Sequence, residues 1–351
     1  MATTVPVVSA TDGPRVSVDD LLKNPRLIPR RILNLLANQF IADKILRPGG
    51  DAPGGAVQFF GNAPQFPNGA DAGVVNEFAE YPIVTYVEGV PQVAIASRRG
   101  FSMQVSEDMR RRNQMDRVLL QMKQGTNLMI RTYNNLFQNS IVAACNLPLA
   151  ATGPTGALAT PGKFNAVNNT TTGQGPAVGA AFTGNTAIAS NAWSTATGAT
   201  ANTIRHDILE AKRLISDQTV DGTSALPGTS YLGFNADTIL MSEHDAALIV
   251  ESADFGTLYA NSPGYNQAPL VKGEIPRELF GMQVETSRSW TSGSVLICER
   301  GTLGFIADER ALQSTPMKFD EDRETWRNNT SRISAIGIDQ PLAAFLITGV
   351  Q

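Results

Sequence analysis

The sequence predicts an α+β protein in which an extended, strand-forming arm runs directly into a long helix. Residues 56–105 are punctuated by glycine and proline, and no lysine lies between Leu46 and Lys123. Residues 106–145 carry arginine and methionine over a length that exceeds an ordinary globular helix. From Thr203 onward, short helical and strand-like runs alternate. An arm followed by such a helix favours a subunit that holds its neighbours over one that encloses a substrate.

Charge is scarce and unevenly distributed along the chain. Of 351 residues, 42% are hydrophobic and 17% charged, which fits a surface largely covered by neighbours because interface cores are depleted in charge. Residues 1–150 hold 15 basic and 12 acidic residues, and residues 151–351 hold 13 and 20. This asymmetry suits head-to-tail packing of identical subunits, or a basic segment near nucleic acid. It falls far short of the basic balance of a dedicated DNA-binding domain.

The two cysteines and the hydropathy pattern indicate the redox compartment and whether the chain meets a membrane. Cys145 and Cys298 lie in apolar surroundings, which predicts buried free thiols in a reducing compartment, with a disulfide as the alternative. Residues 1–10 lack the pattern of a signal peptide. No run of 18 apolar residues is present, so we expect no membrane contact.

The first 48 residues are expected to form an arm followed by one helix. Pro25 and Pro29 should prevent a helix before Arg30, so residues 1–30 are predicted to be extended. Apolar residues then recur at helical spacing between Arg31 and Leu46. The Arg47-Pro48-Gly49-Gly50 run should end that helix.

Two strands and a single long helix are predicted next. The strands are expected at residues 78–87 and 90–105, with a turn at Glu88-Gly89. Ser106 is a suitable cap for a helix that reaches Cys145, about 50–60 Å away. Gly125 should weaken or bend this helix, at a cost of about 1 kcal/mol against alanine. Its predicted packing face consists of Met115, Leu119, Met122, Thr126, Met129, Tyr133 and Leu136.

The back half is predicted to begin with a long connector and to continue as an α/β region. Residues 146–202 are dominated by small and polar residues, with Trp193 as a candidate anchor. Helices are expected at residues 203–217 and after the Ser242 cap to residue 250. Strands are expected at residues 237–241, 282–286, 295–298, 303–307, 313–319, 332–338 and 343–348.

No pattern of catalytic or ligand-binding residues emerges. The chain has two histidines and no Cys/His cluster at zinc-ligand spacing. The run Ser242-Glu243-His244-Asp245 cannot act as a relay, because adjacent helical residues do not face each other. Residues 156–163 imitate a phosphate-binding loop, but the glycine spacing is one residue too long. The acidic run at residues 320–322 is better explained as a solvated or interface turn than as a cation site. We therefore expect no enzyme activity, no cofactor and no metal.

The order of these elements resembles the major capsid proteins of tailed bacteriophages, which share the Hong Kong 97-like fold. The resemblance rests on the passage from Ala94–Phe101 into Ser106–Met109 and the long helix. It continues in Leu279–Val284, where Gln283 replaces the usual proline, and in Gly301–Phe305. It implies an N-terminal arm at 1–48 and an extended E-loop at 49–103. A P-domain with the spine helix would comprise 104–150 and 300–351, and an A-domain 151–299, whose first part, 151–202, is the Gly/Ala/Thr-rich connector.

The resemblance implies a structural subunit that assembles as pentamers and hexamers into an icosahedral virus capsid around packaged double-stranded DNA. The protein would be part of the virion and would be assembled in the host cytoplasm. The DNA would be contacted weakly and without sequence specificity. Because only about 48 residues precede the E-loop, any scaffold would be a separate protein, beside portal and decoration proteins. The alternatives are the shell of a cellular nanocompartment with the same fold, or a soluble α/β enzyme.

The expected contacts between subunits lie in the arm, the E-loop, the start of the spine helix, the 253–273 loop and the acidic turn. These residues are Arg26, Arg30, Arg31, Phe59, Phe60, Phe66, Arg98, Arg99, Arg110, Arg111, Arg112, Tyr259, Tyr265, Glu321 and Asp322. Some relatives join subunits by an isopeptide bond between an E-loop lysine and an asparagine. Asn328 and Asn329 lie in the matching region, but this loop has no lysine, so we expect no such bond.

Overall fold

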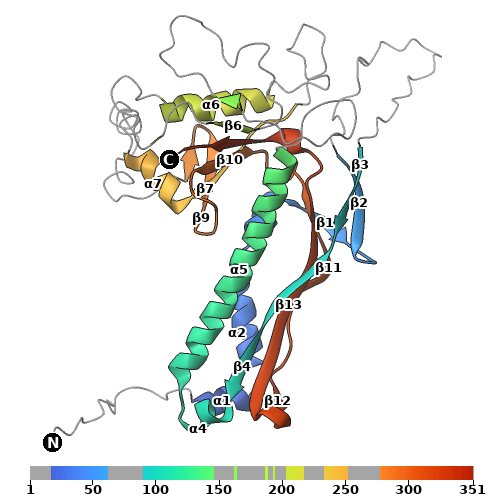
Figure 1. The fold of residues 1–351 in the computed structure, drawn as a ribbon, viewed down its shortest axis with the longest axis vertical. Helices are drawn as coiled ribbons and strands as arrows, with labels where there is room; N and C mark the ends of the chain where they lie inside the picture. The colour runs from blue at the N-terminus through green and yellow to red at the C-terminus, as the bar shows by residue number, and fades with distance from the viewer. Residues whose placement is uncertain are drawn as a thin grey trace, which may run out of the picture. The chain divides into compact units, whose positions relative to one another are not determined.

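The computed structural model describes residues 17–61, 90–145, 162–163, 186–188, 193, 203–216, 233–251 and 277–350 (Figure 1). The chain divides into two compact units. Unit 1 comprises residues 1–40, 97–132 and 310–334, and unit 2 comprises residues 41–96, 133–309 and 335–351. The predicted strand at 78–87 lies outside the described residues, as does most of the 146–202 connector.

Unit 1 is built on a long antiparallel strand pair. Strand β4 (Ser97–Ser106) pairs with β13 (Thr325–Gly337) in continuous register from Ser106↔Thr325 to Ser97↔Ser334 (Figure 1). The short β12 (Lys318–Asp320) pairs with β13 at Lys318↔Arg327. A one-turn 3₁₀ helix, η3 (Glu321–Arg323), connects β12 to β13. The sequence pattern predicted one strand at 313–319, but the chain leaves β11 (Phe305–Ser314) before entering β12.

The predicted single spine helix is wrong in one respect: it begins as two helices. Helix α4 (Glu107–Arg111) is capped as expected, since Ser106 Oγ accepts from the Met109 N–H at 3.3 Å. The chain then turns at Asn113, whose φ of 47° is left-handed and cannot continue an α-helix. Helix α5 (Met115–Cys145) follows with 31 residues, about 46 Å long.

Helix α5 uses nearly the predicted face. Met122, Thr126, Met129 and Tyr133 are buried, and the stripe is completed by residues that the pattern missed, namely Val118, Phe137, Ile141 and Cys145. Gly125 does not interrupt the helix.

The N-terminal region differs from the predicted extended arm. Helix α1 (Val18–Lys23) is followed by α2 (Leu27–Leu36) and then by α3 (Ile41–Ile45) in unit 2. Pro29 lies at the third position of α2, within the first turn, where the missing N–H has no helical partner to lose. The expected single helix at 31–46 is broken at Asn38, which has a positive φ of 57°.

The centre of unit 2 is a mixed sheet in the order β5-β6-β14-β10-β7-β9-β8. Its strands are β5 (Gly162–Lys163), β6 (Thr186–Ile188), β7 (Thr238–Ser242), β8 (Glu278–Leu279), β9 (Met282–Ser287), β10 (Ser294–Cys298) and β14 (Ala344–Thr348). β14 follows the one-turn 3₁₀ helix η4 (Pro341–Ala343). The strands predicted at 237–241, 282–286, 295–298 and 343–348 are confirmed to within a few residues as β7, β9, β10 and β14.

The two faces of this sheet bury two separate cores. On β10, Val295 and Ile297 pack with α6 (Thr203–Ser216) and α7 (Glu243–Glu251), while Leu296 and Cys298 point to the other face. The second core contains α3, the last turns of α5 and Trp290. Both cysteines, Cys145 and Cys298, are free and buried in it, as predicted.

Trp193 confirms its predicted anchoring role. It is buried in the core beneath α6, and its backbone N–H donates to Val350 O at 2.9 Å. Its indole Nε1–H donates to Asp207 Oδ2 at 3.3 Å. The connector is therefore held to the sheet at this residue.

Candidate functional site

The groups most suggestive of catalysis are arranged to hold a turn. Asp245 is fully buried, and its carboxylate accepts from Ser292 Oγ at 3.1 Å and from Gly293 N at 3.0 Å. His244 Nδ1 lies 3.8 Å from Asp245 Oδ1 and 3.5 Å from Ser292 Oγ. In a catalytic relay, one ring nitrogen of the histidine contacts the acid and the other contacts the hydroxyl. Here the same nitrogen of His244, Nδ1, faces both Asp245 and Ser292. The described residues contain no group of His, Cys, Asp and Glu able to hold a metal ion.

No helix among the described residues is long and apolar enough to cross a membrane. Four surfaces of the described residues expose large apolar side chains.

The first surface is one face of a two-stranded hairpin in unit 2. Strand β2 (Ala56–Gly61) pairs with β3 (Val90–Ile95), placing Ala56 opposite Ile95, Gln58 opposite Val93, and Phe60 opposite Pro91. Paired residues point to the same side of a sheet, so these six side chains share a face. Val93 is 62% exposed and Ile95 is 77% exposed. We call this the outer hairpin face.

The opposite face of the hairpin holds it to its own chain. Phe59 packs edge-to-face on Phe305, with ring centroids 5.2 Å apart, in a cluster that also contains Ala94. Phe305 fits there because Gly49, in β1 (Arg47–Asp51), and Gly337 have no side chains; a Cβ on either would lie 2.5 Å from the ring. The expectation grouped Phe59 with Phe60, but the strand register turns them to opposite faces. Phe60 is the member of the pair on the outer face.

The second surface is the exposed side of α5. Leu120 and Leu128 are 55% and 58% exposed. Arg117, Lys123 and Arg131 are exposed around them. After Asp116 the helix contains no acidic residue. We call this exposed side, within residues 115–132, the α5 face.

The third surface is the outside of α2. Ile28, Pro29, Ile32 and Leu36 are buried, which turns Leu27, Arg30, Arg31 and Leu35 outward. Arg26, directly before the helix, is also exposed. All three predicted arginines of the arm are thus on the surface, and α2 contains no acidic residue.

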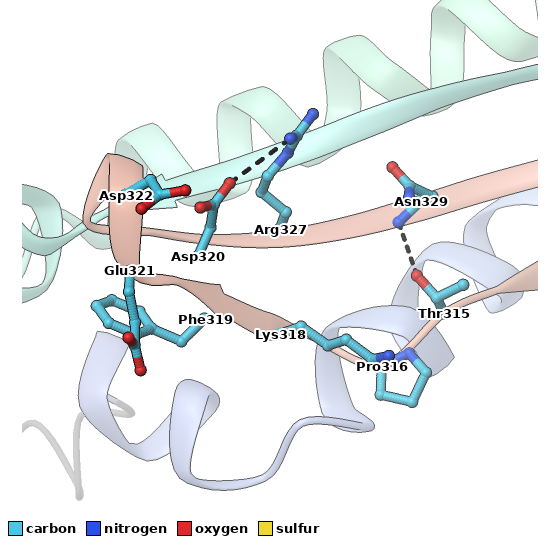
Figure 2. Close-up of a pocket in the computed structure, with 9 residues that line it drawn as sticks. All are labelled: Thr315, Pro316, Lys318, Phe319, Asp320, Glu321, Asp322, Arg327 and Asn329. Atoms are coloured by element: carbon cyan, nitrogen blue, oxygen red, sulfur yellow. Dashed lines mark hydrogen bonds and ion pairs between the residues drawn. The ribbon is translucent and has the colours of Figure 1, made fainter.

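The fourth surface is a groove of about 630 Å³ at the β12–η3 turn of unit 1 (Figure 2). It is lined by Thr315, Pro316, Lys318, Phe319, Asp320, Glu321, Asp322, Arg327 and Asn329. Asp320 lies 3.7 Å from Arg327 (Figure 2), whereas Glu321 and Asp322 are exposed. Phe319 is 47% exposed although its ring packs on Trp326 with centroids 4.6 Å apart. The predicted Glu321 and Asp322 therefore line a recess with an aromatic wall.

The basic start of the spine is partly neutralised within the chain. Arg110 Nε donates to Asp19 Oδ1 at 2.8 Å, and its guanidinium lies 5.3 Å from the centre of the Trp326 ring. Hydrogen bonds from Lys23 and Arg110 lower the pKa of Asp19, and the Asp19 carboxylate raises the pKa of Arg110. Arg111 Nε donates to Glu107 at 3.3 Å. Arg110 therefore joins α4 to α1 and β13, whereas Arg111 is paired within α4, and the spacing of the arginines did not reveal this difference.

The other predicted contact residues divide into two groups. Arg98 and Arg112 are exposed, and Arg99 is half-buried with its Nε donating to Ser97 Oγ. Phe66, Tyr259 and Tyr265 lie outside the described residues.

The charge asymmetry seen along the sequence is sharper between the two units. Unit 1 contains 18 basic and 10 acidic residues, a balance of +8, and unit 2 contains 10 basic and 22 acidic residues, a balance of −12. Residues 48–97, which include the hairpin, hold five acidic residues and no basic one.

The fold is similar to that of a solved phage capsid structure. The capsid structure of the cyanophage P-SCSP1u matches with a TM-score of 0.53 at 10% identity, over 88% of this chain and 88% of that chain. This match confirms the Hong Kong 97-like fold predicted from the sequence.

Two further solved structures resemble this chain. The mature capsid of bacteriophage PhiM1 matches with a TM-score of 0.49 at 8% identity, over 88% of this chain and 86% of that chain. A virus-like particle from Pyrococcus furiosus matches with a TM-score of 0.49 at 8% identity, over 91% and 97% of the two chains. No protein-family model matches the sequence, and no curated protein matches it either.

Proposed function

We propose that this protein is the structural subunit of an icosahedral phage capsid that encloses double-stranded DNA, and that its activity is self-association. In this proposal residues 1–48 act as the arm and 49–103 as the E-loop. Residues 104–150 and 300–351 act as the P-domain, and 151–299 as the A-domain. Pentamers and hexamers of the same chain are its principal partners, with separate scaffolding, portal and decoration proteins beside them. Assembly takes place in the host cytoplasm.

The observation that carries the proposal is the complementarity of the outer hairpin face and the α5 face. The first exposes Val93 and Ile95 within a segment that has only acidic charges. The second exposes Leu120 and Leu128 among cations, with no acid after Asp116. Exposed apolar residues on both faces, carried by segments of opposite charge, are a combination that specific protein interfaces use. We infer that the hairpin of one copy lies on the α5 face of the next.

Such a contact is heterologous, because different surfaces of the two copies meet. Heterologous contacts generate closed rings when the rotation between copies closes, as in pentamers and hexamers. The balance of +8 in unit 1 against −12 in unit 2 supports head-to-tail association. We therefore expect the rate of assembly to fall as ionic strength rises, since salt screens exposed charges beyond about 10 Å at 0.1 M.

The base of the hairpin supports the use of one sequence in two ring sizes. Gly50, Gly54 and Gly55 all have positive φ, at 78°, 84° and 77°. Glycine occupies this region without strain and can move between conformations that other residues avoid. These residues form the joint about which the hairpin would adjust in pentamers and hexamers.

The test is assembly of the expressed full-length chain. We expect large closed particles by negative-stain electron microscopy, and elution in the void volume of a sizing column. Val93→Asp with Ile95→Asp should leave a subunit with wild-type circular dichroism that elutes as a small species. Leu209→Asp is the matched control, because Leu209 is an exposed leucine on α6, outside both faces. Closed shells from the double variant, or a wild-type chain that remains a small oligomer, would overturn the proposal.

The content of the particles decides between a capsid and a nanocompartment shell. DNA inside a capsid would be contacted weakly and without sequence preference by the basic unit, as phosphate contacts are. Particles purified from infected cells should contain nuclease-protected double-stranded DNA. Particles that contain protein cargo and no DNA would establish the nanocompartment instead.

A further inference from the structure

Two neighbouring surfaces of unit 1 take no part in the hairpin contact, and their chemistry is complementary. The outside of α2 combines Leu27 and Leu35 with Arg30, Arg31 and no acid, and the exposed Arg26 directly precedes the helix. The groove at the β12–η3 turn combines the exposed Phe319 with Glu321 and Asp322. One is a cationic apolar ridge, and the other is an acidic recess with an aromatic wall.

The charge of the groove is concentrated where a cation could reach it. Arg327 is paired with Asp320, and their opposite charges therefore cancel (Figure 2). Glu321 and Asp322 remain exposed at one end of the groove. Lys318, also exposed, lies toward the other end (Figure 2). A docking arginine would therefore be drawn to the η3 end.

The ridge and the groove adjoin each other on the same copy. Met317 N donates to Pro25 O at 3.1 Å, which ties the residue before Lys318 to the residue two places before α2. Pro316, the residue before Met317, lines the groove. A surface that carries a ridge beside a complementary groove is self-complementary. A twofold axis then places each ridge on the other copy's groove, and both contacts form at once.

We propose that α2 of one copy docks in the β12–η3 groove of a second copy, and reciprocally, as an isologous contact between two copies of this chain. Leu27 and Leu35 would cover Phe319, and Arg30 and Arg31 would pair with Glu321 and Asp322. This proposal rests on self-association as the proposed function, and adds a contact of different symmetry from that of the hairpin. Rings built by heterologous contacts must also be joined to one another, and an isologous contact between copies of neighbouring rings would join them.

The first test is cross-linking between two differently substituted full-length chains. One carries Arg31→Cys and the other Glu321→Cys, and a short bis-maleimide reagent is added to the mixture. Both native thiols are buried, and burial raises the pKa of Cys145 to about 12, so they do not compete. The mixture is expected to form a covalent dimer that neither protein forms alone. Absence of that dimer overturns the proposal.

The symmetry is tested by placing both substitutions in one chain. An isologous contact closes on itself, so the products should end at the dimer, with two cross-links. A ladder of trimers and higher species would show a head-to-tail contact and would overturn the isologous arrangement.

Charge reversal tests whether the ion pairs recognise each other. Arg30→Glu, added to the Arg31→Cys chain, should lower the dimer yield about tenfold by placing like charges together. Asp322→Lys in the Glu321→Cys chain should restore it. Restoration by the second reversal excludes misfolding as the cause of the loss. A yield unchanged by Arg30→Glu would count against the pairing.

The outcome separates this contact from the proposed function. If shells form but the cross-linked dimer does not, the proposed capsid function stands and the proposed α2–groove contact is refuted. If the cross-linked dimer forms but shells do not, the α2–groove contact stands and the proposed capsid function is refuted.

Discussion

The ring of Phe101, on β4, occupies the space where a side chain on Gly125 would lie. A Cβ at Gly125 would be 2.4 Å from Phe101 Cε2, well inside van der Waals contact. The glycine in the middle of α5 is therefore a site of close approach between helix and strand. A residue that weakens a helix is here the residue that lets the helix approach β4 closely.

Gly125→Ala should consequently destabilise the protein, although alanine is the better helix former by about 1 kcal/mol. Forcing the ring to move should lower the free energy of unfolding by about 1–3 kcal/mol, as overpacking does elsewhere. Urea denaturation measures it. Phe101→Leu in the same chain should recover much of the loss. A Gly125→Ala variant more stable than wild type would contradict the close contact.

Asp245 should contribute to stability and His244 should not. Asp245→Ala leaves Gly293 N without its acceptor in a partly buried site, at a cost of about 1–3 kcal/mol. His244→Ala, at a largely exposed neighbour, should change the free energy of unfolding by less than about 0.5 kcal/mol. The measurement is thermal or urea unfolding of both variants. Equal losses in the two would show that the pair acts together.

His206 should give unit 2 a small pH dependence. The Asp207 carboxylate, 3.5 Å away, raises the pKa of His206 above 6.5, although partial burial opposes the shift. A raised pKa stabilises the folded state fully below pH 6.5, and this contribution is lost as pH rises through the folded value. A third of the side chain is exposed, so we expect only about 0.5 kcal/mol.

The pH dependence is measured by urea unfolding of wild type and His206→Gln between about pH 5.5 and 8.5. The wild type should lose the contribution toward high pH, and the variant should lack this change. A wild type that gains stability relative to the variant with rising pH would reverse the assigned sign.

Assembled particles should dissociate completely into single chains in denaturant. No lysine lies between Leu46 and Lys123, so the hairpin segment lacks the amine that an isopeptide bond requires. Purified particles, boiled in detergent, should give one band at 37.5 kDa on a denaturing gel. A ladder of covalent multimers would refute this expectation.

Features set by neighbouring residues were predictable from the sequence. Ser106 and Ser242 were identified as caps, and their hydroxyls accept from Met109 N and Asp245 N. Short apolar strands such as β7 and β10 were located to within a residue or two. Such features depend on a few adjacent side chains and backbone groups, which the sequence states directly.

Features that depend on strand pairing or on contacts between distant residues were not predictable from the sequence. Nothing local distinguishes Phe59 from Phe60, and only the register of β2 on β3 directs one to Phe305 and the other outward. A one-residue shift of register would exchange them. The arginines of α4 looked alike, yet Arg110 is held by Asp19 and Trp326 because α1 and β13 reach it in the fold.

The sequence by itself determined the order of the elements, the two buried thiols, the absence of lysine from the hairpin segment and the likeness to a capsid fold. These depend on composition and on periodicity along the chain. Only the tertiary structure decided that Gly125 receives a ring, that Val93 and Ile95 share an exposed face, and that α2 adjoins an acidic groove. Each of these depends on residues far apart in sequence, and packing brings them together only when the whole chain has folded.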